Sequence, residues 1–179
     1  VKALTDAGLR ASKCVFDVAD GAAVRAGVAA IEREHGHLDI VVNNAGIRSD
    51  SLLVFMKAEQ WQQVLATNLS SFFNVTQPVV KQMALQRRGR IVTIASTAGQ
   101  TGVEGQTNYS AAKAGVIGAS KSLAREVAKR GVTVDRNYAW DKAVILTPRP
   151  GVAATMLQMH YDNVFEAELR ARQGRVSKP

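Results

Sequence analysis

Apolar residues follow two patterns along this chain: short continuous runs, and longer stretches in which they recur with helical spacing. The continuous runs predict four buried β-strands, at residues 12–16, 38–42, 90–95 and 132–134. The helical spacing predicts three helices, at residues 21–35, 58–86 and 108–129. Strands and helices therefore alternate along the chain.

Glycine and proline indicate where the helices end or bend. Gly36 and Gly131 follow the first and third helices, as helix stop signals do, and Pro78 predicts a kink or break in the second. Continuous apolar strands separated by helices are typical of a parallel sheet covered on both faces. We therefore predict an α/β fold with a parallel sheet, and a single domain over residues 1–179.

Length and composition agree with this fold. The chain has 179 residues, of which 46% are hydrophobic and 21% are charged, so one domain with a sizeable core is expected and disorder is excluded. No apolar run reaches the roughly 18 residues that a membrane-spanning helix needs, and the first residues lack the layout of a signal peptide. A single cysteine, Cys14, excludes a disulfide framework and fits a reducing compartment. Together these features lead us to expect a cytoplasmic protein without membrane contact.

The formal net charge of +8 raises the question of acidic partners. The basic residues are scattered, however, and their densest group, at residues 86–90, lies between a predicted helix and strand. Cations there favour the C-terminal helix dipole, which is the simpler explanation. Since zinc-finger spacing and aromatic RNA-binding signatures are absent, we expect no nucleic-acid partner. His35 and His37 flank a helix end without further His or Cys ligands, so no metal site is expected.

Tyr109 and Lys113 form the first candidate for chemistry. Positions i and i+4 of a helix share a face, so the phenol and the ammonium project in the same direction. A nearby ammonium stabilises tyrosinate and lowers a tyrosine pKa from its usual value of about 10, which lets the phenol exchange a proton with a carbonyl oxygen near neutral pH. Ser96 ends a predicted strand, where its hydroxyl can hold the same oxygen. The alternative is an ordinary surface pair.

A second candidate follows the strand at residues 38–42. Asn44, Ala45 and Gly46 lie at its carboxyl end, where open α/β sheets bind ligands. Gly46 permits a tight turn and a close backbone approach, and the Asn44 amide both donates and accepts hydrogen bonds. The alternative is a structural turn that only closes the strand.

Three further residues are weaker candidates. Asp17 and Val18 follow the first predicted strand, where the carboxylate can cap the next helix or accept from an adenine amino group. Asn68 lies inside a helical stretch, where asparagine is mildly unfavourable. A buried asparagine needs partners there, and bound water is one way to supply them.

These residues lie in stretches that resemble the short-chain dehydrogenase/reductase family, and most closely its 3-oxoacyl-[acyl-carrier-protein] reductases. The matching stretches are residues 38–47, 89–96, 105–118 and 121–127. The resemblance implies a Rossmann-type, doubly wound sheet and a catalytic tetrad of Asn68, Ser96, Tyr109 and Lys113. It assigns Tyr109 as general acid, Ser96 as binder of the substrate oxygen, Lys113 as ribose binder and tyrosine tuner, and Asn68 as holder of a relay water.

The resemblance also implies a nicotinamide cofactor, with NADP(H) favoured over NAD(H). Asp17, Val18 and Asn44 would border its adenine and ribose, and Ala45, Gly46, Tyr109 and Lys113 would also bind the cofactor. Residues 150–156 resemble the family's turn beside the nicotinamide. Gly151 and Ala153 would contact the cofactor in that turn.

The sequence departs from the family in three places. No strand and Gly-rich turn precede Val1, no final strand follows residue 179, and residues 135–149 have no family counterpart. We interpret the chain as an internal fragment or an incomplete sequence rather than as one with a true insertion. The family's Gly-rich turn holds the cofactor pyrophosphate at a helix N-terminus, so we expect the 179 residues alone not to bind a dinucleotide tightly.

The expected function is NAD(P)H-dependent reduction of a 3-oxoacyl thioester, free or bound to an acyl-carrier protein. Arg130 matches a basic residue near the acidic carrier, whereas Phe55 stands where an arginine is usual. The alternatives are a ketoreductase of a polyketide or aryl-polyene pathway, another short-chain alcohol dehydrogenase, and a non-catalytic binding or assembly module. Small residues on the helix at 108–129 also predict a homotetramer or homodimer.

Overall fold

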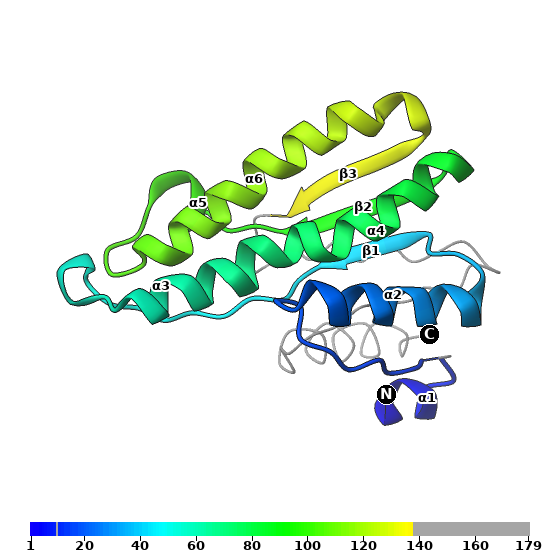
Figure 1. The fold of residues 1–179 in the computed structure, drawn as a ribbon, viewed down its shortest axis with the longest axis horizontal. Helices are drawn as coiled ribbons and strands as arrows, with labels where there is room; N and C mark the ends of the chain where they lie inside the picture. Colours follow the sequence, from blue (N-terminus) through cyan, green and yellow to red (C-terminus); the bar gives the residue numbers. More distant parts are fainter. Residues whose placement is uncertain (10, 138–179) are drawn as a thin grey trace, which may run out of the picture.

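The centre of the fold is a parallel sheet. A computed structural model describes residues 1–9 and 11–137. Within them, β1 (Ile40–Asn43), β2 (Gly89–Ile94) and β3 (Val132–Asn137) pair in the order β1-β2-β3, all parallel (Figure 1). The predicted α/β fold with a parallel sheet is confirmed, and all three carboxyl ends meet at one edge.

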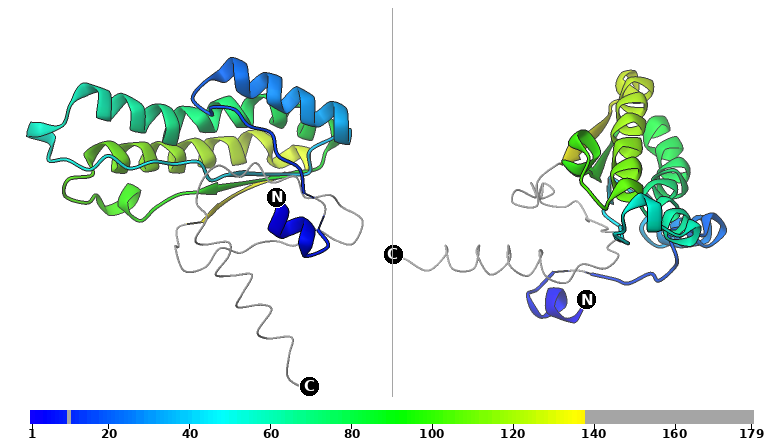
Figure 2. Two further views of the ribbon diagram at one scale, coloured as in Figure 1. Left: turned by 90° about the horizontal axis from the view of Figure 1, so that it is seen from below. Right: turned by 90° about the vertical axis from the view of Figure 1, so that its left-hand side faces the viewer.

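Three long helices form a layer on one face of this sheet (Figure 2). α4 (Ser71–Gln86) and α6 (Thr107–Val127) contact the strands, and α2 (Gly21–His35) packs against α4. Helices on both faces were expected, but the long helices in the described part of the chain lie on one face only. The short α1 (Lys2–Asp6) lies apart from this layer.

The core lies between the helix layer and the sheet. α2 contributes the helically spaced Val24, Val28 and Ile31, which are all buried against apolar residues of α4 and the strands. Each fully buried aliphatic side chain contributes about 1.5–3 kcal/mol through removal of its surface from water. Asp20 caps the start of α2 by accepting from the Ala22 and Ala23 N–H groups, so this helix begins and ends as the sequence predicts.

The predicted helix at residues 58–86 is divided into three segments: α3 (Ala58–Leu65), a π turn called η2 (Ala66–Ser70), and α4. Pro78 lies inside α4 and does not end it, so of the kink or break predicted there the break does not occur. The interruption falls at Asn68 instead, in the wider π turn. The remaining short elements are η1 (Leu53–Phe55), α5 (Ala98–Thr101) and η3 (Ala128–Arg130).

The predicted strand at residues 12–16 is also wrong, since this segment forms no strand and does not pair with the sheet. Val15 is 76% exposed, and only Phe16 turns inward, where its ring lies against Gly27 of α2. A strand needs a neighbour to satisfy its backbone groups. None of the strands within the described ranges lies beside this segment.

Among the residues that the structure describes, no helix combines the length and the apolar character needed to cross a membrane.

Candidate active site

Tyr109 and Lys113 lie on the first turns of α6, one helical turn apart. Both side chains are buried, and the Lys113 ammonium is 5.7 Å from the centroid of the Tyr109 ring. Lys113 also donates a hydrogen bond of 2.7 Å to the carbonyl oxygen of Ile94, the last residue of β2. The pair therefore lies at the carboxyl edge of the sheet.

Burial changes the acidity of Lys113. The side chain is 5% exposed, and the loss of solvation lowers the pKa of its ammonium from 10.5 to about 8. The bond to Ile94 uses one of the three donors that an ammonium carries. The group can therefore bind further acceptors, and it titrates close to neutral pH.

Ser96 follows β2 and is buried at the start of α5. Its Oγ accepts a hydrogen bond of 3.2 Å from the Ala98 N–H, and its own proton can be donated to another oxygen. α5 packs tightly on α6 at Gly99, where a Cβ atom would lie 2.6 Å from the Lys113 carbonyl carbon. This close approach positions the segment that carries Ser96 beside the helix that carries Tyr109.

Asn68 is buried in the π turn η2, and its side chain is paired with backbone. Its Nδ2 donates to the Ile47 carbonyl at 2.9 Å, and its Oδ1 accepts from the Ile47 N–H at 2.8 Å. The expectation that water supplies these partners is thus replaced by a direct link to the segment after β1. π turns of this kind occur frequently at functional sites.

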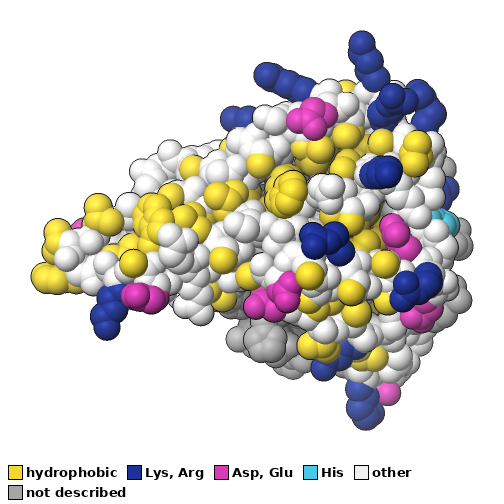
Figure 3. Space-filling model, in the orientation of Figure 1, with side chains coloured by type: hydrophobic (Ala, Val, Ile, Leu, Met, Phe, Trp, Pro, Cys, Tyr) yellow, Lys and Arg dark blue, Asp and Glu magenta, His cyan; other side chains and the backbone are white. Residues whose placement is uncertain are grey.

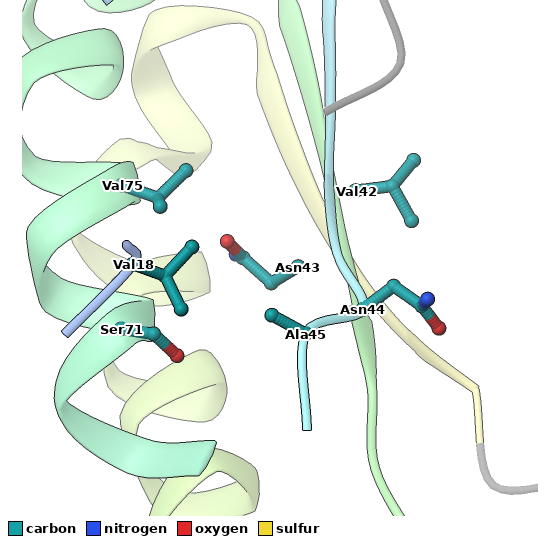
Figure 4. Close-up of a pocket in the computed structure, with 7 residues that line it drawn as sticks. All are labelled: Val18, Val42, Asn43, Asn44, Ala45, Ser71 and Val75. Carbon is teal, nitrogen blue, oxygen red and sulfur yellow. The ribbon is translucent and has the colours of Figure 1, made fainter. Parts of the chain in front are cut away.

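A small surface recess lies beside the end of β1. It is lined by Val18, Val42, Asn43, Asn44, Ala45, Ser71 and Val75. Figure 4 shows Asn43 and Ala45 facing Val18 across the recess, while the side chain of Asn44 extends to the opposite side of β1. Asn43 donates a hydrogen bond of 3.0 Å to the Thr76 hydroxyl on α4. Its side chain therefore points toward the helix layer, whereas that of Asn44 points away from it.

The tight turn expected at Gly46 is not formed. Gly46 is absent from the described glycines with positive φ, and no turn is assigned to residues 44–50. A Cβ atom there would lie 3.6 Å from Asn68 Oδ1, which is ordinary contact. The protein's own packing therefore does not require a glycine at this position.

Asp17 and Val18 lie in the turn before α2. Asp17 is exposed and accepts from the Ala19 N–H at 2.8 Å, so it does not cap the helix, and Asp20 does. Asn74 of α4 donates to the Val18 carbonyl at 2.9 Å and holds this turn against the recess. Gly151 and Ala153, and residues 138–149, lie outside the described residues.

The arrangement brings a phenol, an ammonium and a hydroxyl to one edge of a parallel sheet. A carbonyl oxygen bound there can accept hydrogen bonds from Ser96 and Tyr109, while the Lys113 charge stabilises tyrosinate. The described ranges contain no group of three or more His, Cys, Asp or Glu side chains that could hold a metal ion. The chemistry supported by these side chains is proton transfer to or from an oxygen.

Three residues that shape the site were missed by the sequence reasoning. Asn108 is fully buried, and Gly99 and Gly115 let α5 and η2 approach α6. Gly115 is one of the small residues of the predicted helix at 108–129, and a Cβ atom there would lie 2.8 Å from Leu69 Cδ1 of the same chain. The adjacency of Asn108 to the motif tyrosine was the available signal for its importance.

Comparison with known proteins places this geometry in a family. The sequence profile of the family described as short chain dehydrogenase matches residues 1–138. The chain is 49% identical over 128 residues to the 3-oxoacyl-[acyl-carrier-protein] reductase FabG of Escherichia coli, covering 72% of this chain and 52% of that protein. It is 50% identical over 120 residues to the FabG of Vibrio cholerae, covering 67% of this chain and 49% of that protein.

A relative with a different name is equally similar. Nodulation protein G of Azospirillum brasilense is 56% identical over 119 residues, which cover 66% of this chain and 48% of that protein. The chain spans about half the length of the curated relatives that it matches. By the extent of the family match and the identity to these relatives, the chain belongs to the short chain dehydrogenase family.

Proposed function

We propose that this chain carries the catalytic residues of an NADPH-dependent reductase that converts a 3-oxoacyl thioester into the 3-hydroxyacyl product. The observation that carries the proposal is the buried Tyr109–Lys113 pair at the carboxyl edge of the sheet, with Ser96 on the adjoining segment. The FabG relatives are named as reductases of this substrate class. A nicotinamide cofactor supplies the hydride when it is bound.

Tyr109 is the proposed general acid. It donates its proton to the carbonyl oxygen as the oxygen gains negative charge, and Ser96 donates a hydrogen bond to the same oxygen. Lys113 lowers the pKa of the phenol through its positive charge. Because the pKa of Lys113 is lowered to about 8, part of its charge is lost in mildly alkaline solution.

Asn68 completes the proposed tetrad in a modified way. Both polar atoms of its side-chain amide are hydrogen-bonded to Ile47, so the proposed relay water would bind to the backbone of the π turn instead. The amide itself fixes the segment that leaves β1.

The described residues fit a dinucleotide at the sheet edge. The buried Lys113 ammonium has donor capacity for ribose hydroxyls, and Asn44 with Ala45 lines the recess. Val18 lines the recess and is the proposed apolar contact for an adenine ring, and Asp17 lies exposed beside it. Gly151 and Ala153 are proposed to contact the nicotinamide half. The proposed preference for NADP(H) over NAD(H) rests on the resemblance of the sequence to the family.

The carrier protein is the proposed form in which the substrate arrives. Arg130 is exposed at the end of η3, the turn that follows α6, and its positive charge is complementary to an acidic carrier. Phe55, by contrast, is 74% exposed and offers an apolar surface where the reductases usually have an arginine. Because phenylalanine replaces arginine at this position, a ketoreductase that uses a different carrier is the second candidate function.

A homodimer or homotetramer in the cytoplasm is the proposed assembly. Hydrophobic side chains gather over the helix layer and at the tip formed by η1 (Figure 3). Phe73 of α4 is 64% exposed, and the small Ala114 and Gly118 are exposed on α6. A second copy packed on these helices would cover the exposed apolar surface.

The test is a substrate comparison with the full-length protein that contains this chain. Loss of NADPH absorbance is followed with a 3-oxoacyl thioester on an acyl-carrier protein and with the same acyl group on a short pantetheine analogue. For a simple secondary alcohol, the gain of NADPH absorbance from NADP⁺ is followed instead. The proposal predicts the highest kcat/KM for the carrier-bound substrate. Equal rates with both thioesters would favour the second candidate, and activity with the alcohol alone would contradict the proposal.

A further inference from the structure

Asn108, the residue before Tyr109, is the most deeply buried polar residue of the site. Its side chain is 0% exposed, and its amide joins three parts of the chain. Nδ2 donates to the Ser49 carbonyl at 3.0 Å and to the Gln60 carbonyl at 3.4 Å. Oδ1 accepts from the Tyr109 N–H at 2.7 Å. The amide thus connects the backbone of Tyr109 to α3 and to the segment after β1.

Residues 47–51, which we call the bridging segment, are also held at other points. Asn68 binds both backbone groups of Ile47, and the Ser51 N–H donates to the Gly105 carbonyl at 2.8 Å. The Gln60 Nε2 donates to the Ser49 hydroxyl at 2.9 Å. The bridging segment therefore runs from the candidate residue Asn68 to the start of the helix that carries Tyr109.

The bond pattern separates Asn108 from an ordinary helix cap. A cap satisfies N–H groups of its own helix, whereas two of the three bonds of Asn108 cross to other elements that surround the site. A buried amide without partners is costly, so these bonds define a narrow range of positions for the residue. Its neighbour Tyr109 shares the same first turn of α6 and is restricted with it.

We propose that Asn108 is a positioning residue for Tyr109, which locks the phenol relative to Lys113 and to Asn68 through the bridging segment. The proposal rests on the proposed function only for its kinetic readout. A displacement of about 1 Å at a reacting group can cost up to about a hundredfold in rate. Loss of the lock is therefore expected to reduce kcat more than the affinity for the cofactor.

The test compares Asn108→Leu with wild type and with Ser120→Ala in the full-length protein. Leucine is close to asparagine in size but removes all three hydrogen bonds. Ser120 is a buried hydroxyl two or more turns further along α6 and lies outside the proposed site. For Asn108→Leu we expect kcat to fall about tenfold or more while the cofactor dissociation constant changes less than about threefold. Ser120→Ala should retain the wild-type kcat.

A second readout does not depend on activity. The midpoint of the ultraviolet titration of Tyr109, taken as the difference from a Tyr109→Phe protein, should shift in Asn108→Leu, because the position of the phenol relative to the Lys113 ammonium changes. A structural role alone would lower the melting temperature and leave this titration and kcat unchanged, which would overturn the proposal. If wild type reduced no 3-oxoacyl thioester, the proposed function would fail, while the titration would still decide the role of Asn108.

A milder variant covers the case in which Asn108→Leu does not fold. Asn108→Ser retains an oxygen near the Tyr109 N–H but cannot reach Ser49 and Gln60 together. A kcat reduced about threefold or more, with a titration shifted in the same direction, would support the positioning role. Wild-type values for both in folded Asn108→Ser would contradict it.

Discussion

Replacing Lys113 by methionine should change how stability depends on pH. The substitution keeps a flexible side chain of similar length but removes a charge that is 5% exposed. Burial lowers the pKa of Lys113 from 10.5 to about 8, whereas the unfolded chain binds that proton up to a pH near 10.4. Between about pH 8 and 10.4 the unfolded state holds more protons, so a rise in pH stabilises the folded wild type.

The magnitude follows from the same two values. The difference between 10.5 and about 8 corresponds to roughly 3 kcal/mol of stability that wild type lacks at neutral pH and recovers by about pH 10.4. Lys113→Met has no charge to desolvate and should not show this rise. At neutral pH, Lys113→Met gains stability because it buries no charge, but it loses the hydrogen bond to the Ile94 carbonyl, which costs about 1.5–3 kcal/mol. The change with pH is therefore a better measure than the absolute stability.

The assay is urea unfolding of the cofactor-free protein at several pH values between about 7 and 10.5. The stability of wild type minus that of Lys113→Met should rise by about 2–3 kcal/mol across this range. Lys113→Arg is the matched control, because arginine stays charged throughout and its difference from methionine should stay constant. Parallel profiles for wild type and Lys113→Met would refute the desolvation argument.

The close contacts of α6 give two further predictions. Gly99→Ala should cost about 1–3 kcal/mol in denaturant unfolding and reduce kcat, because its Cβ would lie 2.6 Å from the Lys113 carbonyl carbon; unchanged values for both would contradict this contact. Gly115→Ala should destabilise the protein, because its Cβ would lie 2.8 Å from Leu69. Gly118→Ala should stabilise it by about 0.5–1 kcal/mol, because no atom lies within 4 Å of the new Cβ. Equal shifts in melting temperature for the two variants would contradict this packing.

Local pattern was sufficient for the elements that bury one continuous face. The helical spacing of Val24, Val28 and Ile31 identified α2 with both of its ends, and the run at residues 90–95 located β2 within one residue of its bounds. These elements form where their own sequence pattern predicts, because each buries its continuous apolar face in the core.

Elements that depend on distant partners could not be predicted in this way. The run at residues 12–16 has strand-like residues, but strand pairing needs a neighbour that sequence pattern does not reveal. The π turn at Asn68 arises because its amide binds Ile47, twenty-one positions earlier. The same reason hid Asn108, whose partners Ser49 and Gln60 are remote in sequence.

The candidate site was predictable to the extent that its residues lie at strand ends and on one helix face. Tyr109 and Lys113 are adjacent because of the helix period, and Ser96 and Asn44 reach the same edge because the strands are parallel. The tight contact of α5 with α6 at Gly99 had no sequence signal beyond the glycine itself.

The most direct test of the proposed chemistry is a single-turnover measurement on Tyr109→Phe. The full-length protein is first loaded with NADPH, with the dissociation constant measured by cofactor fluorescence, and is then mixed with a 3-oxoacyl thioester. The account predicts a reduction rate about 10²–10⁴-fold below wild type, because the phenylalanine ring has no proton to donate, with cofactor affinity nearly unchanged. A rate above about a tenth of the wild-type value at equal cofactor occupancy would exclude Tyr109 as the general acid.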